Sequence, residues 1–366
     1  MSNRHKYYFP QLDSIRGLSF LAVYCFHAFH PQFGSSFLGG MVNYFYQNLV
    51  LSIDVFFILS AFLLTWLGIN EYKVKGNFSF VNYFIRRALR IWPLYFLLML
   101  FAFVIVPFAS SYFNVPVSLP PAYYYLFFIS NFYLEGHVYF LRFLWTLSVE
   151  EQFYLLWGIC LLLFQKRLMV CVALLAALSF CYTVYAIYNN VHHDFNTLTY
   201  LFDFAVGIWA AILMHKQNRV TAFFKNISRR KNLAFFLSLP LFFILIFCFY
   251  YFAPTSFSPW IDLLGRYLFI IFTGLLIIEQ MVNENSLLRL KTQKFLIYTG
   301  KISYGLYCFH GIVLTFGIII LQKLEIEMPI VLRGVIFLII NYLVSAISYS
   351  FIEKPFLRLK NKVRRV

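Results

Sequence analysis

Charged side chains are scarce in this sequence, since Asp, Glu, Lys and Arg together make up 12% of its 366 residues. Soluble domains carry about 25%. Hydrophobic residues instead reach 61%, and apolar runs of about 20 residues, long enough to cross a bilayer core, recur from end to end. A chain of soluble domains is therefore excluded, and the composition predicts an all-α polytopic membrane protein.

Acidic residues are the scarcer of the charged ones, so 30 Lys and Arg against 14 Asp and Glu leave a formal net charge of +16. The basic residues stand in short clusters between the apolar runs, without a zinc-finger, recognition-helix or RNA-binding pattern. We therefore expect no nucleic acid among the partners. The clusters are typical of loops that anchor a membrane protein on its cytoplasmic side.

Familiar metal and nucleophile motifs are also lacking. The six cysteines lie within apolar runs and form no C-x-x-C pair. The pair His27 and His30, and the stretch "HHD" at 192–194, are too sparse for a zinc site. Ser60 and Ser148 lack the G-x-S-x-G surroundings of a nucleophilic serine. We expect no metal.

The apolar runs predict a bundle of about ten transmembrane helices with both termini in the cytoplasm. The expected crossings are 17–33, 47–69, 91–109, 145–164, 168–188, 197–214, 233–253, 260–280, 298–320 and 329–352. The stretch 121–134 is ambiguous, because its fourteen residues are too few to span comfortably. With ten crossings, 26 of the 30 Lys and Arg residues fall on the cytoplasmic side. Counting 121–134 as an eleventh crossing would break that pattern, so we expect it to lie along or re-enter the outer face.

The domain organisation follows from these crossings. The start of the chain imitates a signal peptide, with basic residues before the apolar stretch 18–29, but no convincing cleavage site follows and we expect it to be retained. The longest stretch outside the crossings, 110–144, is too short for a soluble catalytic domain. We expect residues 1–366 to form a single transmembrane domain without an appended soluble one, so that any chemistry takes place within the bundle.

The first helix carries two ionisable residues on one face. Arg16 and His27 are eleven residues apart, which is three turns plus about 20°, and the rise between them is about 16 Å. This puts Arg16 near the inner surface and His27 near the middle of the membrane. Arg16 alone is also explained as an anchor paired with Asp13, and His27 as a hydrogen-bonding partner of a neighbouring helix.

The segment "FIRRALRIWPLYF" packs Arg86, Arg87 and Arg90 into little more than one turn at the inner start of the third helix. Positive-inside anchoring explains any two of them. Three together also form a receptor for phosphate, which planar guanidinium groups bind in a bidentate manner.

Carboxylates supply the remaining candidates. Glu150 and Glu151 in "LWTLSVEEQFYLLW" point about 100° apart, so at least one should face the bundle. Asp54 lies in the outer third of the second crossing. A carboxylate near a mid-membrane imidazole suggests an acid–base pair, although an interhelical hydrogen bond explains it too. Further intramembrane ionisable residues are Asp203, Asp262 and His310.

Six ordered segments resemble motifs of the acyltransferase-3 family of membrane acyltransferases, and together they cover essentially the whole chain. They are "LDSIRGLSFLAVYCFH", "IDVFFILSAFLLT", "RRALRIWPLY", "LWTLSVEEQFYLLW", "ISYGLYCFH" and "SYSFIEKPF". One departure is Ala61, where the family has glycine after the serine of the second helix.

The resemblance implies transfer of an acyl group, usually acetyl from cytoplasmic acetyl-CoA, to a hydroxyl of a cell-surface or lipid-linked glycan. It implies catalytic roles for His27 and Glu150. The residues that it implies for binding the donor are Arg16, Arg86, Arg87 and Arg90, and residues with possible supporting roles are Asp13, Asp54, Glu151 and His310. The expected location is the cytoplasmic (plasma) membrane. Some members add an outer esterase-like domain, which we do not find here, so the acceptor stays open.

A transporter of a lipid-linked saccharide or small anion is the alternative, because the same polar residues could line a substrate pathway. Discontinuous helices paired in two symmetric halves would favour it, and no such symmetry is visible in the sequence.

Overall fold

The computed structural model describes residues 8–29, 36–112, 117–133, 139–216 and 218–363. Within these ranges every regular element is a helix and none is a strand. Serine and asparagine caps mark several helix starts. The side chain of Ser79, for example, accepts a hydrogen bond from the backbone N–H of Asn82 at 3.3 Å, where α4 begins. The predicted all-α fold is confirmed.

Nine helices of the described ranges are long and apolar enough to cross a membrane. Each corresponds to one of the expected crossings, and several extend well beyond the expected ends. Their bounds are Phe37–Lys75, Phe80–Tyr112, Tyr139–Leu163, Gln165–Tyr188, Thr197–Lys216, Arg229–Phe252, Thr255–Val282, Ser303–Lys323 and Ile330–Leu359. A multi-pass membrane protein follows from this count.

The first helix, α1, has bounds different from those expected. It spans Pro10–Ala28 rather than 17–33, and it is not among the nine because its first half is polar. Pro10 stands in the first helical turn, where its fixed φ favours a start. Pro31 follows a few residues after the end, and a proline disfavours helix in the residue before it. These two prolines are the signals that would have given the correct bounds. His30 lies outside the described residues.

The ambiguous stretch 121–134 contains no helix that could cross a membrane in its described part, up to residue 133. It holds a one-turn helix α6 (Tyr123–Leu126) and a 3₁₀ turn η4 (Ser130–Phe132). Its exclusion from the crossings therefore agrees with the structure.

The chain divides into two compact units that interleave along the sequence. The first comprises Met1–Ile69, Met169–Val191 and Tyr200–Ser303, and the second Asn70–Leu168, His192–Thr199 and Tyr304–Val366. The single transmembrane domain stays a prediction. Besides α1, the helices of the first unit are α2 (Phe37–Gln47), η2 (Asn48–Leu51), α3 (Ser52–Lys75, whose end belongs to the second unit), α9 (Leu168–Tyr188), α10 (Leu201–Lys216), α11 (Arg219–Lys225), α12 (Arg229–Phe252), η7 (Thr255–Phe257), α13 (Ser258–Val282), η8 (Leu290–Thr292) and α14 (Lys294–Lys301).

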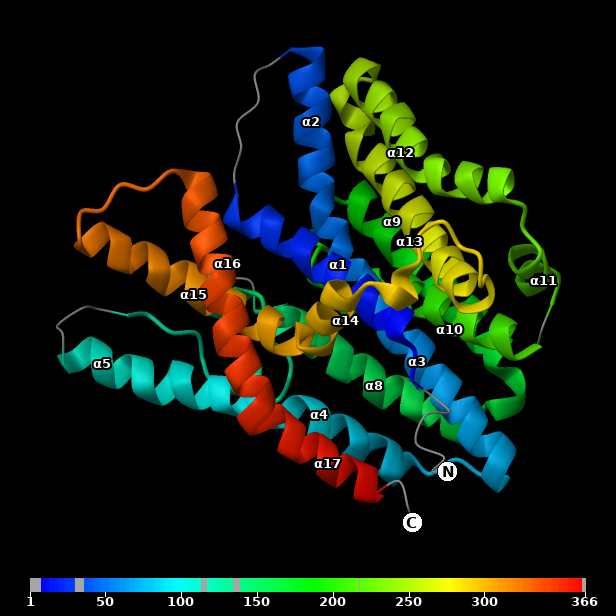
Figure 1. The fold of residues 1–366 in the computed structure, drawn as a ribbon, viewed down its shortest axis with the longest axis horizontal. Coiled ribbons are helices and arrows are strands. Elements are labelled where there is room, and N and C mark those ends of the chain that lie inside the picture. Colours follow the sequence, from blue (N-terminus) through cyan, green and yellow to red (C-terminus); the bar gives the residue numbers. More distant parts are fainter. Residues whose placement is uncertain (1–7, 30–35, 113–116, 134–138, 217, 364–366) are drawn as a thin grey trace. The chain divides into compact units, whose positions relative to one another are not determined.

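Glycines let two helices of the first unit approach until their backbones touch. Figure 1 shows α1 beside α14, and these helices pack closely. A Cβ atom on Gly300 would lie 1.8 Å from the carbonyl oxygen of Asp13, and one on Gly17 would lie 2.4 Å from that of Leu296. Only glycine fits at these two positions, so α14 fixes the place of α1 within this unit.

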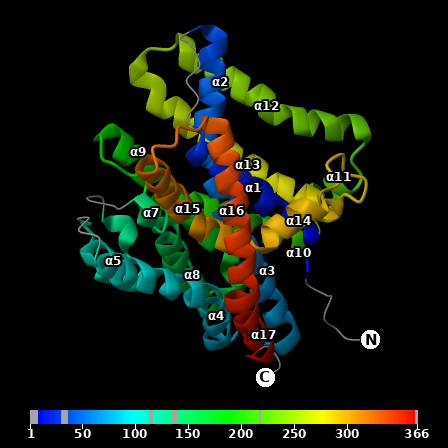
Figure 2. The same ribbon diagram turned by 60° about the vertical axis from the view of Figure 1, so that its left-hand side comes forward.

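The second unit is built around α4 and α8. Its helices are α4 (Phe80–Leu100), the π-helix η3 (Phe101–Ile105), α5 (Val106–Tyr112), α6, η4, α7 (Tyr139–Arg142), α8 (Trp145–Leu163), η5 (Gln165–Arg167), η6 (Thr197–Tyr200), α15 (Ser303–Lys323), α16 (Ile330–Ser348), the π-helix η9 (Tyr349–Glu353) and α17 (Lys354–Val363). Figure 2 shows α16 continuing into α17 as one long rod, and α17 packs along α4.

Candidate functional site

The first half of α1 holds a buried ion pair. Nη1 of Arg16 lies 3.2 Å from Oδ1 of Asp13, one turn earlier, and both side chains are about nine-tenths buried. The hydroxyl of Ser14 donates a hydrogen bond to the carbonyl of Leu290 at 2.7 Å and thereby ties α1 to η8. The expected partnership of Arg16 with Asp13 is therefore present, but inside the protein rather than at an exposed helix end.

His27 lies in the last turn of α1 and is half-buried. The hydroxyl of Tyr46 in α2 donates to the carbonyl of Phe26 at 2.7 Å, which fixes this end of the helix. The ring of Phe26 stands edge-on to the imidazole, with 5.0 Å between ring centres. Because α1 is one unbroken helix from Pro10 to Ala28, Arg16 and His27 do lie on one face, as their spacing predicts.

Asp54 belongs to a buried ion cluster that joins three helices of the first unit. Arg266 of α13 donates from Nε to Oδ2 of Asp54 at 3.0 Å, and from Nη2 to Oδ2 of Asp203 on α10 at 2.7 Å. The guanidinium also lies over the ring of Tyr200, 4.7 Å from its centre. Asp54 is thus paired with Arg266 of another helix. From the sequence alone, Arg266 was recognisable only as a basic residue near an outer helix end.

The structure separates the three arginines of α4, all in the second unit. Arg86 is bound by a carboxylate, with 2.9 Å between its Nη2 and Oε2 of Glu71. Arg90 is half-buried. Arg87 is 7% exposed, and no carboxylate of the described residues lies within ion-pair distance of it. Its guanidinium lies 5.7 Å from the centre of the Tyr154 ring. Among the described residues, Arg87 is therefore a buried cation without a carboxylate at ion-pair distance.

The two glutamates of α8 have different surroundings. Glu150 is half-buried and accepts a hydrogen bond from the hydroxyl of Tyr154 at 2.7 Å. Tyr154 therefore connects the carboxylate of Glu150 with the guanidinium of Arg87. Glu151 is the more buried of the pair, and its Oε2 lies 3.5 Å from the indole Nε1 of Trp92.

His310 is fully buried in the middle of α15. Its Nδ1 is hydrogen-bonded to the carbonyl of Tyr307, one turn earlier, and its ring centre lies 4.3 Å from that of Phe143. The hydroxyl of Tyr307 in turn donates to the carbonyl of Phe143 at 2.9 Å. These contacts join α15 to the segment before α8.

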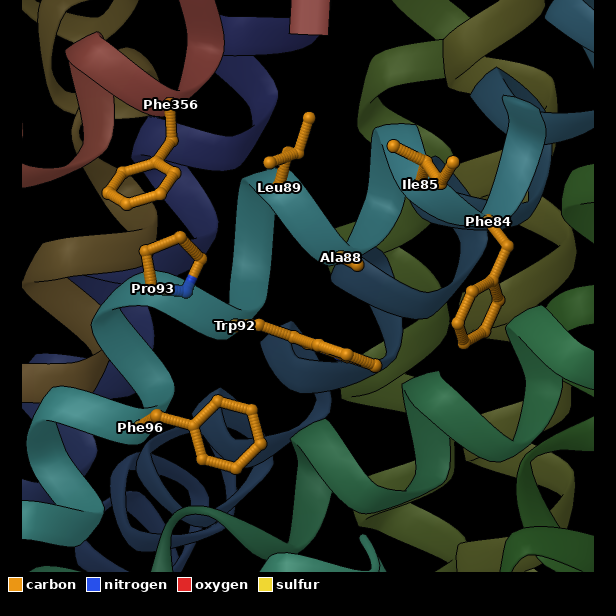
Figure 3. A pocket seen from close by; sticks show the side chains of 8 residues that line it. All are labelled: Phe84, Ile85, Ala88, Leu89, Trp92, Pro93, Phe96 and Phe356. Carbon is orange, nitrogen blue, oxygen red and sulfur yellow. The ribbon is translucent and has the colours of Figure 1, made fainter. Parts of the chain in front are cut away.

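An open apolar groove runs along the face of α4 beside these arginines (Figure 3). Its volume is about 400 Å³, and its lining residues are Phe84, Ile85, Ala88, Leu89, Trp92, Pro93, Phe96 and Phe356. Trp92 forms part of the groove and also donates to Glu151. A groove with this apolar lining is suited to binding a hydrocarbon chain. The polar groups that could bind a charged ligand in the second unit are instead Arg87 and its neighbours.

The candidate residues are therefore distributed over both units. The first holds Asp13, Arg16, His27 and Asp54, whereas the second holds Arg86, Arg87, Arg90, Glu150, Glu151 and His310. In the described ranges no group of three or more His, Cys, Asp or Glu side chains is placed to hold a metal ion.

Three residues that the sequence analysis did not single out as site candidates emerge from the structure. Arg266 holds two buried carboxylates, Tyr154 links Arg87 to Glu150, and Glu353 is a further buried carboxylate in η9. An arginine or glutamate within a membrane span was the available signal for two of them. A tyrosine gives no such signal, because tyrosines are common throughout this chain.

These features define a multi-pass, all-helical membrane protein with buried cations and carboxylates inside its helical units. The pattern of an acyltransferase domain, that of the acyltransferase-3 family, matches residues 9–350. The chain belongs to this family.

Curated relatives agree with this assignment. The peptidoglycan O-acetyltransferase OatA of Listeria monocytogenes is 26% identical over 376 residues, which are 95% of this chain and 56% of that protein. YrhL of Bacillus subtilis, provisionally named a peptidoglycan O-acetyltransferase, is 26% identical over 96% of this chain and 55% of its own length. No solved structure matches the chain. The chain spans little more than half the length of these relatives, and the family and their names support an acyltransferase activity.

Proposed function

We propose that this chain is a membrane O-acyltransferase, in the simplest case an O-acetyltransferase. It moves the acyl group of cytoplasmic acetyl-CoA to a hydroxyl of a cell-surface or lipid-linked glycan. The names of the relatives support the acetyl group and a glycan acceptor. The net charge of +16 and the clustering of basic residues support a place in the cytoplasmic membrane with both termini inside.

Arg87 is the observation that carries this proposal. A buried guanidinium costs much free energy unless an anion compensates it. No described carboxylate lies within ion-pair distance of it, and Glu150 and Glu151 act on its charge only from further away, whereas the neighbouring Arg86 is paired directly with Glu71. The phosphates of CoA would supply the missing negative charge, and guanidinium groups are the donors that fit phosphate oxygens best. Arg90, one turn further along α4, would provide a second guanidinium group that donates hydrogen bonds to the phosphates of CoA.

The reaction needs one proton transfer and one acyl transfer. The acceptor oxygen attacks the thioester carbon, so a C–O bond forms and the C–S bond breaks. In the direct route, a ring nitrogen of His27 takes the proton of the acceptor hydroxyl and returns it to the departing thiolate. In the covalent route the imidazole first carries the acyl group itself. An uncharged imidazole serves both routes.

The residues around His27 and Glu150 have supporting roles in this scheme. The Asp13–Arg16 pair and the glycine contacts with α14 hold α1, and hence His27, in place. Glu150 receives the hydroxyl of Tyr154, whose ring lies against Arg87, and so responds to the charge at the donor site. We assign Glu150 to orienting or recharging the base.

The proposal is tested by following the leaving thiol. Purified full-length protein in liposomes should release free CoA from acetyl-CoA when a lipid-linked or polymeric glycan is present. Mass spectrometry should find one added acetyl per released thiol. Surface glycans from cells that lack the gene should have lost an acetyl group. Thiol release without acetylated glycan, or unchanged surface glycans, would contradict the proposed acceptor class.

A further inference from the structure

Three polar side chains of the second unit form a closed ring of hydrogen bonds. Nε2 of Gln152 on α8 donates to Oδ1 of Asn131 at 2.8 Å, and Nδ2 of Asn131 donates to the hydroxyl of Thr197 at 3.1 Å. The hydroxyl of Thr197 donates to Oε1 of Gln152 and closes the ring. Each member donates to the next, so the hydrogen bonds polarise and strengthen one another. We name Gln152, Asn131 and Thr197 the polar ring.

The polar ring joins α8 to two segments from elsewhere in the chain. Asn131 belongs to the 3₁₀ turn η4, and Thr197 is the first residue of η6. A second contact lies one turn earlier on the same face of α8. There Ser148 is hydrogen-bonded to Ser130 of η4, with 2.8 Å between the two hydroxyl oxygens. This face of α8 is therefore fixed at two successive turns, by Ser148 and by Gln152.

The same contacts hold a strained backbone before η4. Phe128 has a φ of +54°, in the left-handed region that a bulky side chain rarely adopts. The amide nitrogen of Gln152 donates to the carbonyl of Phe128 at 2.8 Å, and the ring of Phe128 stacks on that of Tyr95, with 4.5 Å between the ring centres. Such a conformation persists only where the surrounding contacts enforce it. The polar ring therefore fixes one definite arrangement of α8 against this segment.

Glu150 lies on the opposite side of α8 from these contacts. At 100° per residue it stands about 160° from Gln152 around the helix axis. There it accepts the hydrogen bond from Tyr154, whose ring lies against Arg87 of α4. A rotation of α8 about its own axis would therefore move Glu150 relative to the proposed donor site. Because a helix with its side chains is about 10–12 Å in diameter, a rotation of about 10° displaces the carboxylate by about 1 Å.

We propose that Gln152, Asn131 and Thr197 are positioning residues of acyl transfer, because the polar ring sets the rotation of α8 and thereby the place of the Glu150 carboxylate. The inference rests on the proposed function, in which Glu150 orients or recharges the base. Hydrophobic attraction between helices is weak in lipid, so directional hydrogen bonds are well suited to fixing a rotation. A displacement of about 1 Å at a reacting site can lower the rate by up to about 100-fold. The polar ring therefore bears on turnover and not only on stability.

Two substitutions of Thr197 test the proposal. Thr197→Val removes the hydroxyl that closes the polar ring and keeps the volume of the side chain, whereas Thr197→Ser keeps the hydroxyl. In the purified full-length protein, Thr197→Val should lower kcat for acetyl transfer about 10-fold, and Thr197→Ser should stay within about 2-fold of the wild type. Kd for CoA should be unchanged in both variants, because neither substitution touches the arginines proposed to bind the donor.

Thr199→Val is the matched control, because Thr199 lies two residues further along the chain and outside the polar ring. Its hydroxyl donates to the carbonyl of His193 at 2.7 Å, so the control also loses a hydrogen bond. Thr199→Val and Thr197→Val should lower the melting temperature by similar amounts, but only Thr197→Val should lower kcat. Equal kcat values for these two variants would overturn the proposal and leave the polar ring a stabilising contact.

A double variant tests whether the polar ring acts through Glu150. Glu150→Gln should itself lower kcat, and adding Thr197→Val should lower the residual kcat no further, because the carboxylate that the ring positions is already gone. A further loss in the double variant would overturn the inference. A wild-type kcat for Glu150→Gln would overturn the role of Glu150 in the proposed function, and with it this inference. A low kcat for Glu150→Gln beside a wild-type kcat for Thr197→Val would overturn this inference alone.

Discussion

The most severe single substitution that we predict in the first unit is Arg266→Gln. Its guanidinium makes three contacts with two buried carboxylates, at 3.0 and 3.4 Å to Asp54 and 2.7 Å to Asp203. Glutamine removes the charge and leaves both carboxylates without compensation. Removing one partner of a buried ion pair costs about 3–5 kcal/mol, and two carboxylates depend on this one cation. We therefore expect Arg266→Gln to lower the free energy of unfolding by an amount at the upper end of that range.

Replacing one or the other of the two carboxylates by its amide should change the stability of the protein by different amounts. Among the described residues, Oδ1 of Asp203 is buried without a hydrogen-bond partner, so only one oxygen of Asp203 contacts Arg266, whereas both oxygens of Asp54 do. Two carboxylates against one guanidinium leave an excess negative charge that Asp203→Asn removes. We expect Asp203→Asn to cost less than about 1.5 kcal/mol and Asp54→Asn about 1.5–3 kcal/mol. Replacing all three residues by Met and Leu should recover most of the stability lost in Arg266→Gln.

The assay is the melting temperature of the detergent-solubilised protein, followed by the loss of its monodisperse peak in size-exclusion chromatography. Arg266→Gln should lower it by roughly 5–10 °C. The triple apolar variant should melt within a few degrees of the wild type. Equal melting temperatures for Arg266→Gln and the wild type would refute the reasoning, and so would a triple variant less stable than the single one.

Three further predictions concern other parts of the molecule. In steady-state assays, Arg87→Gln should raise KM for acetyl-CoA about 10- to 100-fold, whereas Arg86→Gln should change this KM less than about 3-fold. Equal effects of the two substitutions would indicate that both arginines only anchor the helix at the membrane surface. Gly300→Ala should lower the melting temperature by the equivalent of about 1–3 kcal/mol, because its Cβ would meet the α1 backbone; Gly40→Ala, with only an ordinary contact at 3.5 Å, is the control, and equal losses would contradict the close approach. Single cysteines introduced at 218–228 should react with an impermeant thiol reagent only from the cytoplasmic side; reaction from outside would overturn the topology.

The fold class could be predicted from the sequence because it depends on composition and run length. Apolar runs of about 20 residues allow only helices in lipid. The ends of α1 could not be read from hydropathy, because its buried first half is polar. Asp13 and Arg16 neutralise each other inside the protein, so they lower the hydropathy of the helix without making it a surface element. The positions of Pro10 and Pro31 in the sequence indicate instead where this helix begins and ends.

Candidate residues could be listed from the sequence, but their partners could not. Periodicity gives the face of a helix and not the helix that it meets. For this reason Asp54 looked like a possible partner of an imidazole, and the structure pairs it with Arg266, 212 positions later. The same limit hid the difference between Arg86 and Arg87, which are neighbours in sequence but face Glu71 and Tyr154 respectively. Only three-dimensional contacts show which cation is already compensated.

The central claim is that His27 performs the acyl-transfer chemistry, and the comparison of His27→Ala with His27→Gln tests it most directly. Both variants are matched to the wild type for expression and for CoA affinity, and acetyl transfer to glycan is measured. Loss of a general base reduces turnover about 10²- to 10⁴-fold. Glutamine can keep a hydrogen bond to a neighbouring helix but cannot take a proton at neutral pH. Both variants should therefore be nearly inactive while CoA binding persists. Substantial acetyl transfer by His27→Gln would contradict it.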